Sequence, residues 1–195
     1  EIMPAGKREA LVLDKPFENW IGLDVYPTEI IDEIYEINMP YLESMYLDLG
    51  NATSFPFSSL KNIEYLYLYS GNLGGVDLSV LEKLINVSLS GCGLTDASFF
   101  SLYQLTSISL SNNYDLAWID IYGCYSLTHL NAKYCNLSSY AVEEITYILV
   151  NIGQANGRLY LDYGNNAPAN YYAQQNINIL VSRGWTVYTN VQEEL

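Results

Sequence analysis

A short pattern of aliphatic residues returns along this chain at a nearly constant spacing. One copy, from Leu84 to Leu94, reads L-I-N-V-S-L-S-G-C-G-L. Successive copies begin 21 or 22 residues apart, at Trp20, Leu42, Ile63, Leu84, Leu105 and Leu127. A unit of this size cannot bury its apolar edge alone, so each unit must stack on its neighbours. This repetition constrains the fold more than any other feature of the sequence.

The pattern and its period are typical of leucine-rich repeats. We therefore predict an α/β leucine-rich repeat solenoid, a right-handed coil with a parallel concave β-sheet and with short helices or extended segments on the convex side. The pattern occurs a second time inside one unit, at Leu116, midway between Leu105 and Leu127. That coil is predicted to have extended segments on both sides.

Residues that cap helices, placed ahead of apolar runs, predict four helices. The first covers 29–38 after Thr28, and the second covers 95–102 with Thr95 as its cap. The third covers 140–152 after Ser138 or Ser139, with Glu143 and Glu144 in its first turn. The fourth covers 168–182, with Pro168 in its first turn and Gly184 after its end. Further strands are predicted at 11–13, 158–163 and 185–188. The chain is thus divided into an N-terminal cap or linker (1–19), the repeats (20–155) and a C-terminal capping unit (156–195).

The composition is acidic and rich in tyrosine. The chain of 195 residues carries 22 Asp and Glu against 8 Lys and Arg, for a formal charge of −14. This charge repels polyanions, so nucleic acid and anionic lipid are not expected partners. The 19 tyrosines indicate a wet surface suited to contacts, because tyrosine is amphipathic.

No cofactor or metal is predicted. The three cysteines occupy repeat positions that favour a small buried residue, and Cys92 and Cys135 lie two coils apart, about 10 Å, too far for a disulfide. A single histidine and no paired thiols argue against zinc. No apolar run approaches the roughly 18 residues of a membrane helix, so no membrane insertion is expected. The start at Glu1 suggests a mature or trimmed product, from which any export signal or anchor would have been removed. A flanking domain of a longer chain is a candidate partner.

Two segments resemble a known family. The tandem pattern from Leu116 to Leu137 resembles bacterial leucine-rich repeat proteins of the kind found in Bacteroidetes. The ending, with Asn156-Gly-Arg-Leu-Tyr-Leu161, Gly164-Asn-Asn-Ala-Pro168 and Leu180-Val-Ser-Arg-Gly-Trp-Thr-Val187, resembles the C-terminal cap of those arrays. The resemblance implies a secreted or surface protein, or a phage structural module, with a binding rather than a catalytic role.

Side chains between the inward-pointing aliphatics should line the concave sheet in three columns, because strand side chains alternate. The first column is Gly22, Ser44, Tyr65, Asn86, Ser107, His129 and Arg158, the second is Asp24, Tyr46, Tyr67, Ser88, Ser109, Asn131 and Tyr160, and the third is Tyr26, Asp48, Tyr69, Ser90, Ser111, Lys133 and Asp162. The candidate ligand-binding residues on this face are Tyr46, Tyr65, Tyr67, Tyr69, Asp48, His129, Lys133, Arg158 and Tyr160. A trough of small residues lies between two bulky ends and could accept a peptide loop or a glycan. The alternative is that Tyr and Ser simply suit a β surface.

A catalytic interpretation is weaker than a binding one. Ser107 and His129 are neighbours in one column, about 5 Å apart by strand spacing. A nucleophile and base also need an orienting acid and an oxyanion site, which a flat sheet does not supply. We therefore predict that the chain is not an enzyme.

The leading hypothesis is an interaction module that binds protein or glycan by its concave face, extracellularly or at a bacterial cell surface. The alternative is a structural or adhesion module of a larger assembly, such as a phage virion component.

Overall fold

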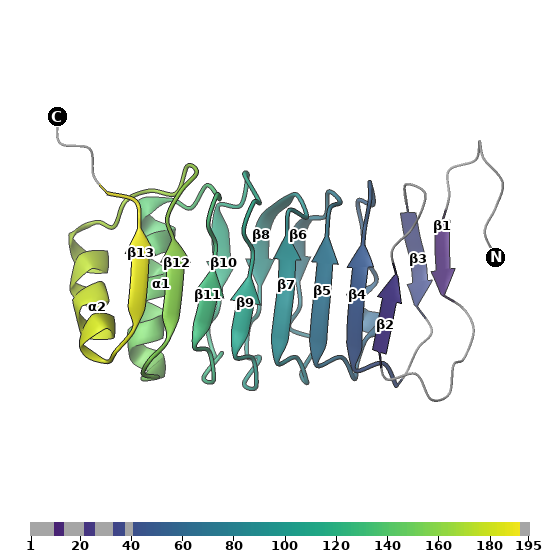
Figure 1. Cartoon of the computed structure of the whole chain (residues 1–195), viewed down its shortest axis with the longest axis horizontal. Coiled ribbons are helices and arrows are strands. Elements are labelled where there is room, and N and C mark those ends of the chain that lie inside the picture. The colour runs from purple at the N-terminus through teal and green to yellow at the C-terminus, as the bar shows by residue number, and fades with distance from the viewer. Residues whose placement is uncertain (1–9, 14–21, 26–32, 38–40, 192–195) are drawn as a thin grey trace.

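The computed structural model describes residues 10–13, 22–25, 33–37 and 41–191. Its main feature is a sheet of eight parallel strands, seen from the front in Figure 1, in the order β13-β12-β11-β9-β7-β5-β4-β2. These strands are β2 (Gly22–Val25), β4 (Ser44–Asp48), β5 (Tyr65–Tyr69), β7 (Asn86–Ser90), β9 (Ser107–Ser109), β11 (His129–Asn131), β12 (Arg158–Leu161) and β13 (Thr186–Thr189). Each strand therefore begins a new coil of a solenoid beside the previous one.

The return segments lie behind this sheet (Figure 1). A second parallel sheet has the order β10-β8-β6, with β6 (Gly74–Asp77), β8 (Leu94–Ser98) and β10 (Trp118–Asp120). The remaining elements are β1 (Ala10–Leu13), β3 (Glu33–Ile37), the short 3-10 helix η1 (Phe57–Ser59), α1 (Ser139–Ile152) and α2 (Tyr171–Ser182). This parallel α/β solenoid confirms the predicted fold class and is consistent with a leucine-rich repeat fold.

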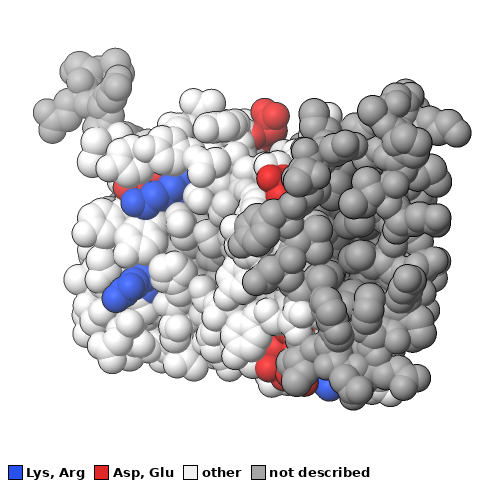
Figure 2. All heavy atoms as spheres, turned by 45° about the vertical axis from the view of Figure 1, so that its right-hand side comes forward, with Lys and Arg blue, Asp and Glu red and all other residues white. Residues whose placement is uncertain are grey.

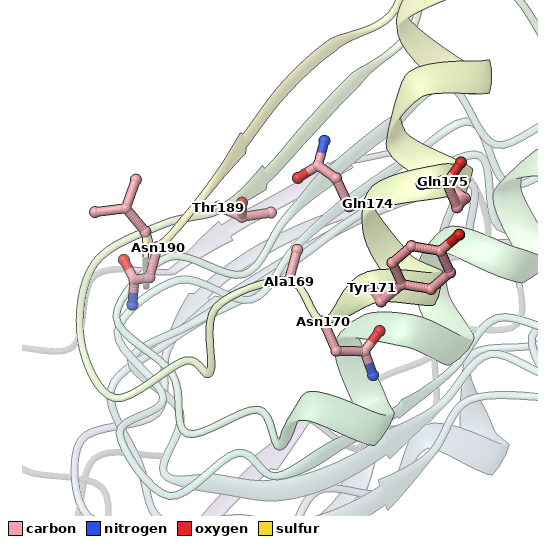
Figure 3. A pocket seen from close by; sticks show the side chains of 8 residues that line it. Ala169, Asn170, Tyr171, Gln174, Gln175, Thr189 and Asn190 are labelled. Atoms are coloured by element: carbon pink, nitrogen blue, oxygen red, sulfur yellow. The ribbon is translucent and has the colours of Figure 1, made fainter. Parts of the chain in front are cut away.

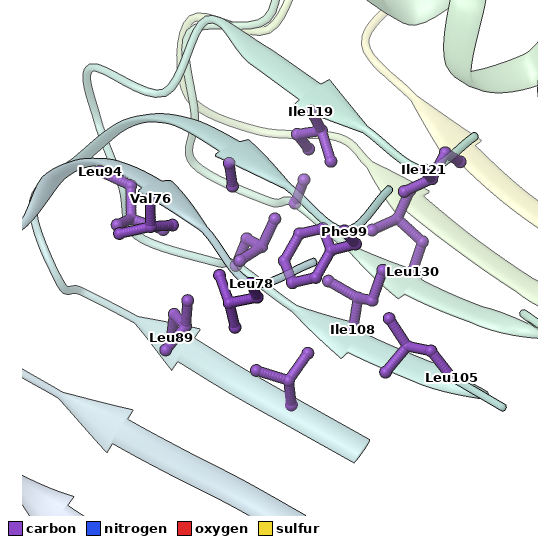
Figure 4. Packing of buried hydrophobic residues seen from close by; sticks show 14 of the residues in the cluster. Val76, Leu78, Leu89, Leu94, Phe99, Leu105, Ile108, Ile119, Ile121 and Leu130 are labelled. Atoms are coloured by element: carbon purple, nitrogen blue, oxygen red, sulfur yellow. The ribbon is translucent and has the colours of Figure 1, made fainter. Parts of the chain in front are cut away.

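The strands stack in the predicted register. Val87 pairs with Ile108 and Ile108 pairs with Leu130 on consecutive parallel strands. Their side chains are at most 2% exposed. The large buried ring of Phe99 lies among the aliphatic side chains between the two sheets (Figure 4). The repeated aliphatics therefore share one continuous core.

Buried polar side chains tie the turns after the strands to neighbouring coils. The Asn113 amide donates to the carbonyls of Leu89 (2.9 Å) and Leu110 (2.8 Å), and its oxygen accepts from the Leu94 N–H (3.0 Å). Asn166 makes the same kind of set in the last coil. Because a buried backbone group without a partner is costly, these side chains stabilise turns that the strand ladder leaves unpaired.

The three cysteines stabilise turns in the same way as Asn113 and Asn166. Cys92 and Cys135 lie in turns after strands of the large sheet, and Cys124 lies after β10 in a return segment. Each thiol donates to a backbone carbonyl, from Cys92 to Leu68 (3.3 Å), from Cys135 to Leu110 (3.3 Å) and from Cys124 to Phe99 (3.1 Å). All three are free and buried. Burial raises the pKa of each thiol to about 12, so these cysteines are neutral structural groups at ordinary pH.

Two predicted helices are wrong. The segment predicted as a helix over 95–102 is strand β8 to Ser98, paired on both sides with β6 and β10. The segment predicted over 29–38 contains β3, which pairs in parallel with β1; Thr28 lies outside the described residues. A short isolated helix is marginal, and ladder hydrogen bonds to neighbouring coils favour the extended backbone instead. The doubled pattern of the Leu105 unit correctly predicted β9 and β10 on opposite sides.

The C-terminal helices are confirmed with changes at their starts. Ser138 caps α1, its hydroxyl accepting from the Ala141 N–H (3.1 Å). Glu143 and Glu144 lie beyond the first turn of α1, which contains no acidic residue. Helix α2 starts at Tyr171 with Asn170 as its cap, so Pro168 precedes the helix and does not occupy its first turn. The predicted strands within 158–163 and 185–188 correspond to β12 and β13.

The two ends of the chain differ in their pairing. At the N-terminal end the predicted strand at 11–13 exists as β1, but its partner is the return strand β3. At the C-terminal end β13 continues the large sheet beside β12, and the buried Trp185 indole donates to the Gln154 carbonyl (2.8 Å). No helix in the described part of the chain is long and apolar enough to cross a membrane.

Candidate functional site

The outward side chains of the large sheet, here called the sheet face, form the three predicted rows. Strand pairing aligns Ser44, Tyr65, Asn86, Ser107, His129 and Arg158 in the first row. The second row aligns Tyr46, Tyr67, Ser88, Ser109, Asn131 and Tyr160. Asp48, Tyr69 and Ser90 are paired in the third row. Tyr26 lies outside the described residues. Strand pairing thus places eight of the nine candidate binding residues on this face, and the ninth, Lys133, lies over the Tyr160 ring. They form an N-terminal and a C-terminal group.

The N-terminal group, here called the tyrosine shelf, comprises Tyr46, Tyr65, Tyr67 and Tyr69. The Tyr46 ring meets the Tyr69 ring edge to face, with centroids 4.4 Å apart, and lies 6.5 Å from the Tyr67 ring. Beside the shelf, the Asp48 carboxylate accepts from the Gly50 N–H (3.0 Å). Asp48 thus holds its own turn and is less available to a ligand than the sequence suggested.

Serine hydroxyls form the middle of the sheet face. The Ser90 hydroxyl lies within hydrogen-bond distance of the hydroxyls of Ser88 (3.3 Å), Ser109 (3.2 Å) and Ser111 (3.2 Å). All four residues are partly exposed. This serine network makes the centre of the face low and polar between two aromatic ends.

The C-terminal group, here called the basic-aromatic group, comprises His129, Lys133, Arg158, Tyr160 and Tyr188. The Lys133 ammonium lies 4.8 Å from the centroid of Tyr160 and 5.9 Å from that of Tyr188. The two tyrosine rings stack on each other at 5.5 Å, with 9° between their planes. Cation–π contacts of this kind are worth about 0.5–2 kcal/mol, so Lys133 holds the rings together.

The two cations of this group differ in their pairing. Lys133 Nζ lies 3.5 Å from Asp162 Oδ2. Arg158 is exposed and makes no ion pair with any described residue. Figure 2 shows blue atoms at two places on its left side, the upper one beside red atoms. Arg158 thus presents the free positive charge of the sheet face.

Two polar atoms of the third row are buried without a hydrogen-bond partner among the described residues. They are Tyr69 Oη in the tyrosine shelf and Asp162 Oδ1, whose carboxylate pairs with Lys133 of the basic-aromatic group. A buried polar atom without a partner costs about 1–3 kcal/mol, and such atoms often mark functional surfaces. Each aromatic end of the face therefore has one such atom, and the described residues of the serine network have none.

The residues weighed as a nucleophile and a base are side by side but not linked. Ser107 and His129 are paired in register on β9 and β11, and no hydrogen bond joins their side chains. Burial, and then the neighbouring Arg158 charge, lower the pKa of His129. In the described part of the chain, no three His, Cys, Asp or Glu side chains form a group that could hold a metal ion.

The sequence columns missed several aromatic residues. Tyr188 extends the second row by one strand, but its distance from Tyr160 along the chain departs from the repeat spacing. On other surfaces, three pairs stack between successive coils at 5.8–5.9 Å, namely Phe100 with Tyr122, Tyr103 with Tyr125 and Trp118 with Tyr140. The members of each pair are 22 residues apart in the sequence, a period that could have revealed them.

A hollow of about 470 Å³ lies at the C-terminal end, between the start of α2 and the end of β13 (Figure 3). Amide and hydroxyl side chains line it, among them Asn170, Gln174, Thr189 and Asn190. None of its lining residues carries a charge. The sheet face therefore offers the more specific chemistry.

No protein-family model matches the sequence, and no curated protein matches it. The likeness to bacterial leucine-rich repeat proteins accordingly remains a prediction from the motifs quoted above.

Proposed function

We propose that the chain is a non-catalytic module that binds an extended polypeptide segment across its sheet face. The observation that carries this proposal is the composition of that face, in which Tyr, Ser and Asn stand in register over successive strands. The same residue types dominate antibody paratopes, where tyrosine supplies rigid contact area and serine and asparagine supply adaptable hydrogen bonds.

The contacts of the rings favour a polypeptide over a glycan. A sugar stacks on an open ring face, but the Tyr160 and Tyr188 rings stack on each other and the Lys133 ammonium lies over Tyr160. The Tyr46 ring is likewise engaged with Tyr69. Ring edges and hydroxyl groups remain available, and these suit hydrogen bonds and side-chain packing with a peptide.

The dimensions of the face suit a short extended segment. Between β4 and β12 the large sheet has five strand-to-strand steps, about 24 Å at the usual spacing. An extended chain covers this length with about seven residues. Its central side chains would lie over the serine network, and its ends would contact the tyrosine shelf and the basic-aromatic group.

The test is peptide selection followed by a matched pair of variants. The whole chain is used to select binders from a phage-displayed library of random 12-residue peptides, and the affinities of synthetic copies are measured. Replacing Tyr46, Tyr65, Tyr67 and Tyr69 together by Ser should lower affinity at least about 10-fold, because aromatic anchors dominate interface energetics.

The control replaces four exposed tyrosines outside the large sheet, Tyr103, Tyr114, Tyr122 and Tyr125, by Ser. This variant should keep its affinity, and circular dichroism should show both variants folded. Unchanged binding by the shelf variant, or failure to select any peptide, would contradict the proposal.

A second candidate function is a structural module of a larger assembly, as the sequence also suggested. It is supported by the three stacked aromatic pairs outside the large sheet, whose members are 36–62% exposed. A neighbouring subunit could cover them. Loss of assembly by the control variant, with peptide binding absent, would favour this function. For either function we propose an extracellular or cell-surface location, which the family resemblance supports.

A further inference from the structure

We infer that the sheet face selects acidic peptide segments and that Arg158 is the residue that binds their carboxylate. This inference rests on the proposed function and adds the ligand's chemistry to it. It starts from the contrast between a strongly acidic chain and a cation left unpaired on its candidate binding face.

Among the described cations, Arg158 combines a place on the sheet face with a guanidinium that makes neither an ion pair nor a hydrogen bond with any described residue. Lys133 pairs with Asp162, and the Arg183 guanidinium donates to the Val150 carbonyl (2.6 Å). Lys83 donates to the Asn62 amide oxygen (2.7 Å), and Lys61 precedes β5, outside the sheet face. Arg158 is therefore the described cation that is both on the sheet face and available.

The neighbours of Arg158 on the adjacent strands neither cover its guanidinium nor carry a negative charge. Strand pairing places His129 on one side of it and Thr186 on the other, and both Arg158 and Thr186 are exposed. Neither neighbour is acidic, so no described carboxylate beside Arg158 competes for its five donors. A planar guanidinium of this kind binds a carboxylate through two parallel hydrogen bonds.

The stacked rings of Tyr160 and Tyr188 lie beside Arg158 and provide an aromatic surface for the rest of the peptide. Tyr160 and Tyr188 follow Arg158 and Thr186 by two residues on the same strands, so their side chains lie on the same face, one row along. The Lys133–Asp162 pair holds these rings in place and neutralises its own charges. An acidic side chain would thus reach Arg158 while the adjacent peptide packs against the ring edges.

The charge of the whole chain explains why one cation can decide selectivity. With a formal charge of −14, the protein repels an acidic peptide everywhere except where a local positive charge compensates. A peptide with its carboxylate in any other register would meet that repulsion. Arg158 would therefore determine where the acidic residue lies, and so the register of the segment.

The experiment uses the 12-residue peptides selected on the whole chain. We expect Asp or Glu to be enriched at one position, and replacing that residue by Asn or Gln should weaken binding. Arg158→Gln should weaken binding of the acidic peptide about 10-fold to 100-fold, the range for losing a charge-assisted hydrogen-bonded pair. It should hardly change binding of the neutral peptide, since the pair is then already absent. Arg158→Lys should fall between the wild type and Arg158→Gln, because it keeps the charge and loses the fork geometry.

Lys61→Gln is the matched control, because it removes the same charge from an exposed position outside the sheet face. Equal losses for Arg158→Gln and Lys61→Gln would overturn the inference. Selected peptides without an acidic position, whose binding still depends on the tyrosine shelf, would overturn it and leave the proposed function standing. Failure to select any peptide would overturn both. If the chain bound uronic-acid oligosaccharides and no peptide, its ligand would be an acidic glycan. That result would contradict both the proposed function and this inference.

Discussion

The two aromatic ends of the sheet face use the same outward positions of the repeat, but different interactions hold their rings. In the tyrosine shelf, the rings contact one another, as in the edge-to-face pair of Tyr46 and Tyr69. In the basic-aromatic group, the rings are organised around the Lys133 ammonium, which contacts Tyr160, Tyr163 and Tyr188 and pairs with Asp162.

This difference separates what the repeat requires from what each coil can vary. The repeat requires the buried aliphatics and the turn-stabilising Asn or Cys, which are present beneath both ends. The outward positions have no such requirement, so neighbouring coils can place rings, hydroxyls or charges there. Stability should therefore depend on shared features, and each end should respond to its own chemistry.

The largest expected effect tests whether the two ends belong to one cooperative unit. Leu89 lies in the middle strand β7 and is fully buried. Leu89→Ala should lower the free energy of unfolding by about 2–5 kcal/mol, measured by chemical denaturation. Signals from the tyrosines (near-UV circular dichroism) and from the backbone (far-UV) should shift together. The exposed Val80→Ala should change stability by less than about 0.5 kcal/mol; separate transitions in Leu89→Ala would show that the ends unfold independently.

The next effect is a dependence of stability on pH, caused by the buried thiols of Cys92 and Cys135. The folded chain keeps Cys92 and Cys135 protonated up to about pH 12, whereas an unfolded thiol ionises near 9.0. Above pH 9 the unfolded state therefore binds fewer protons, and stability should fall as pH rises towards 12, by roughly 1 kcal/mol per thiol and pH unit. Cys92→Ala and Cys135→Ala should each make this fall less steep, to a similar extent. A slope unchanged by both substitutions would contradict the assigned burial.

The third effect is expected only at the C-terminal end. Lys133→Met removes the partner of Asp162, whose side chain is 15% exposed, and should cost about 1–3 kcal/mol because a largely buried carboxylate then lacks a counter-ion. Adding Asp162→Asn should restore part of this loss. The exposed Lys61→Met serves as the comparison and should change stability by less than about 0.5 kcal/mol. Equal losses for Lys133→Met and Lys61→Met in urea denaturation would mean that Lys133 does not organise this end.

The smallest effect is expected at the N-terminal end. Tyr46→Leu keeps an apolar side chain and removes the edge-to-face contact with Tyr69, so it should cost about 0.5–1.5 kcal/mol. Because no ion pair is involved, the loss should not depend on salt, whereas that of Lys133→Met should shrink as salt increases. Urea denaturation at low and high ionic strength measures both. A salt-dependent loss for Tyr46→Leu would remove the distinction between the two ends.

Much of the candidate site could be predicted because its residues follow the repeat. Tyr65, Asn86 and Ser107 are separated by the repeat period, so their alignment follows from counting. Tyr188 could not be placed in this way, since a helix and a turn of different length intervene between β12 and β13. The pairing of Lys133 with Asp162 also escaped prediction, because it depends on how long side chains orient between neighbouring strands.

The sequence by itself determined the stack. Aliphatic residues at a constant period can be buried only against the same positions of the next coil, and this sets the parallel strands, their register and the inward and outward sides. The tertiary structure decided the return path, where 94–98 forms strand β8 because extended neighbours on both sides complete its hydrogen bonds. It also decided which cation is paired and which is left available, since Lys133 has a carboxylate within reach and Arg158 has none among the described residues.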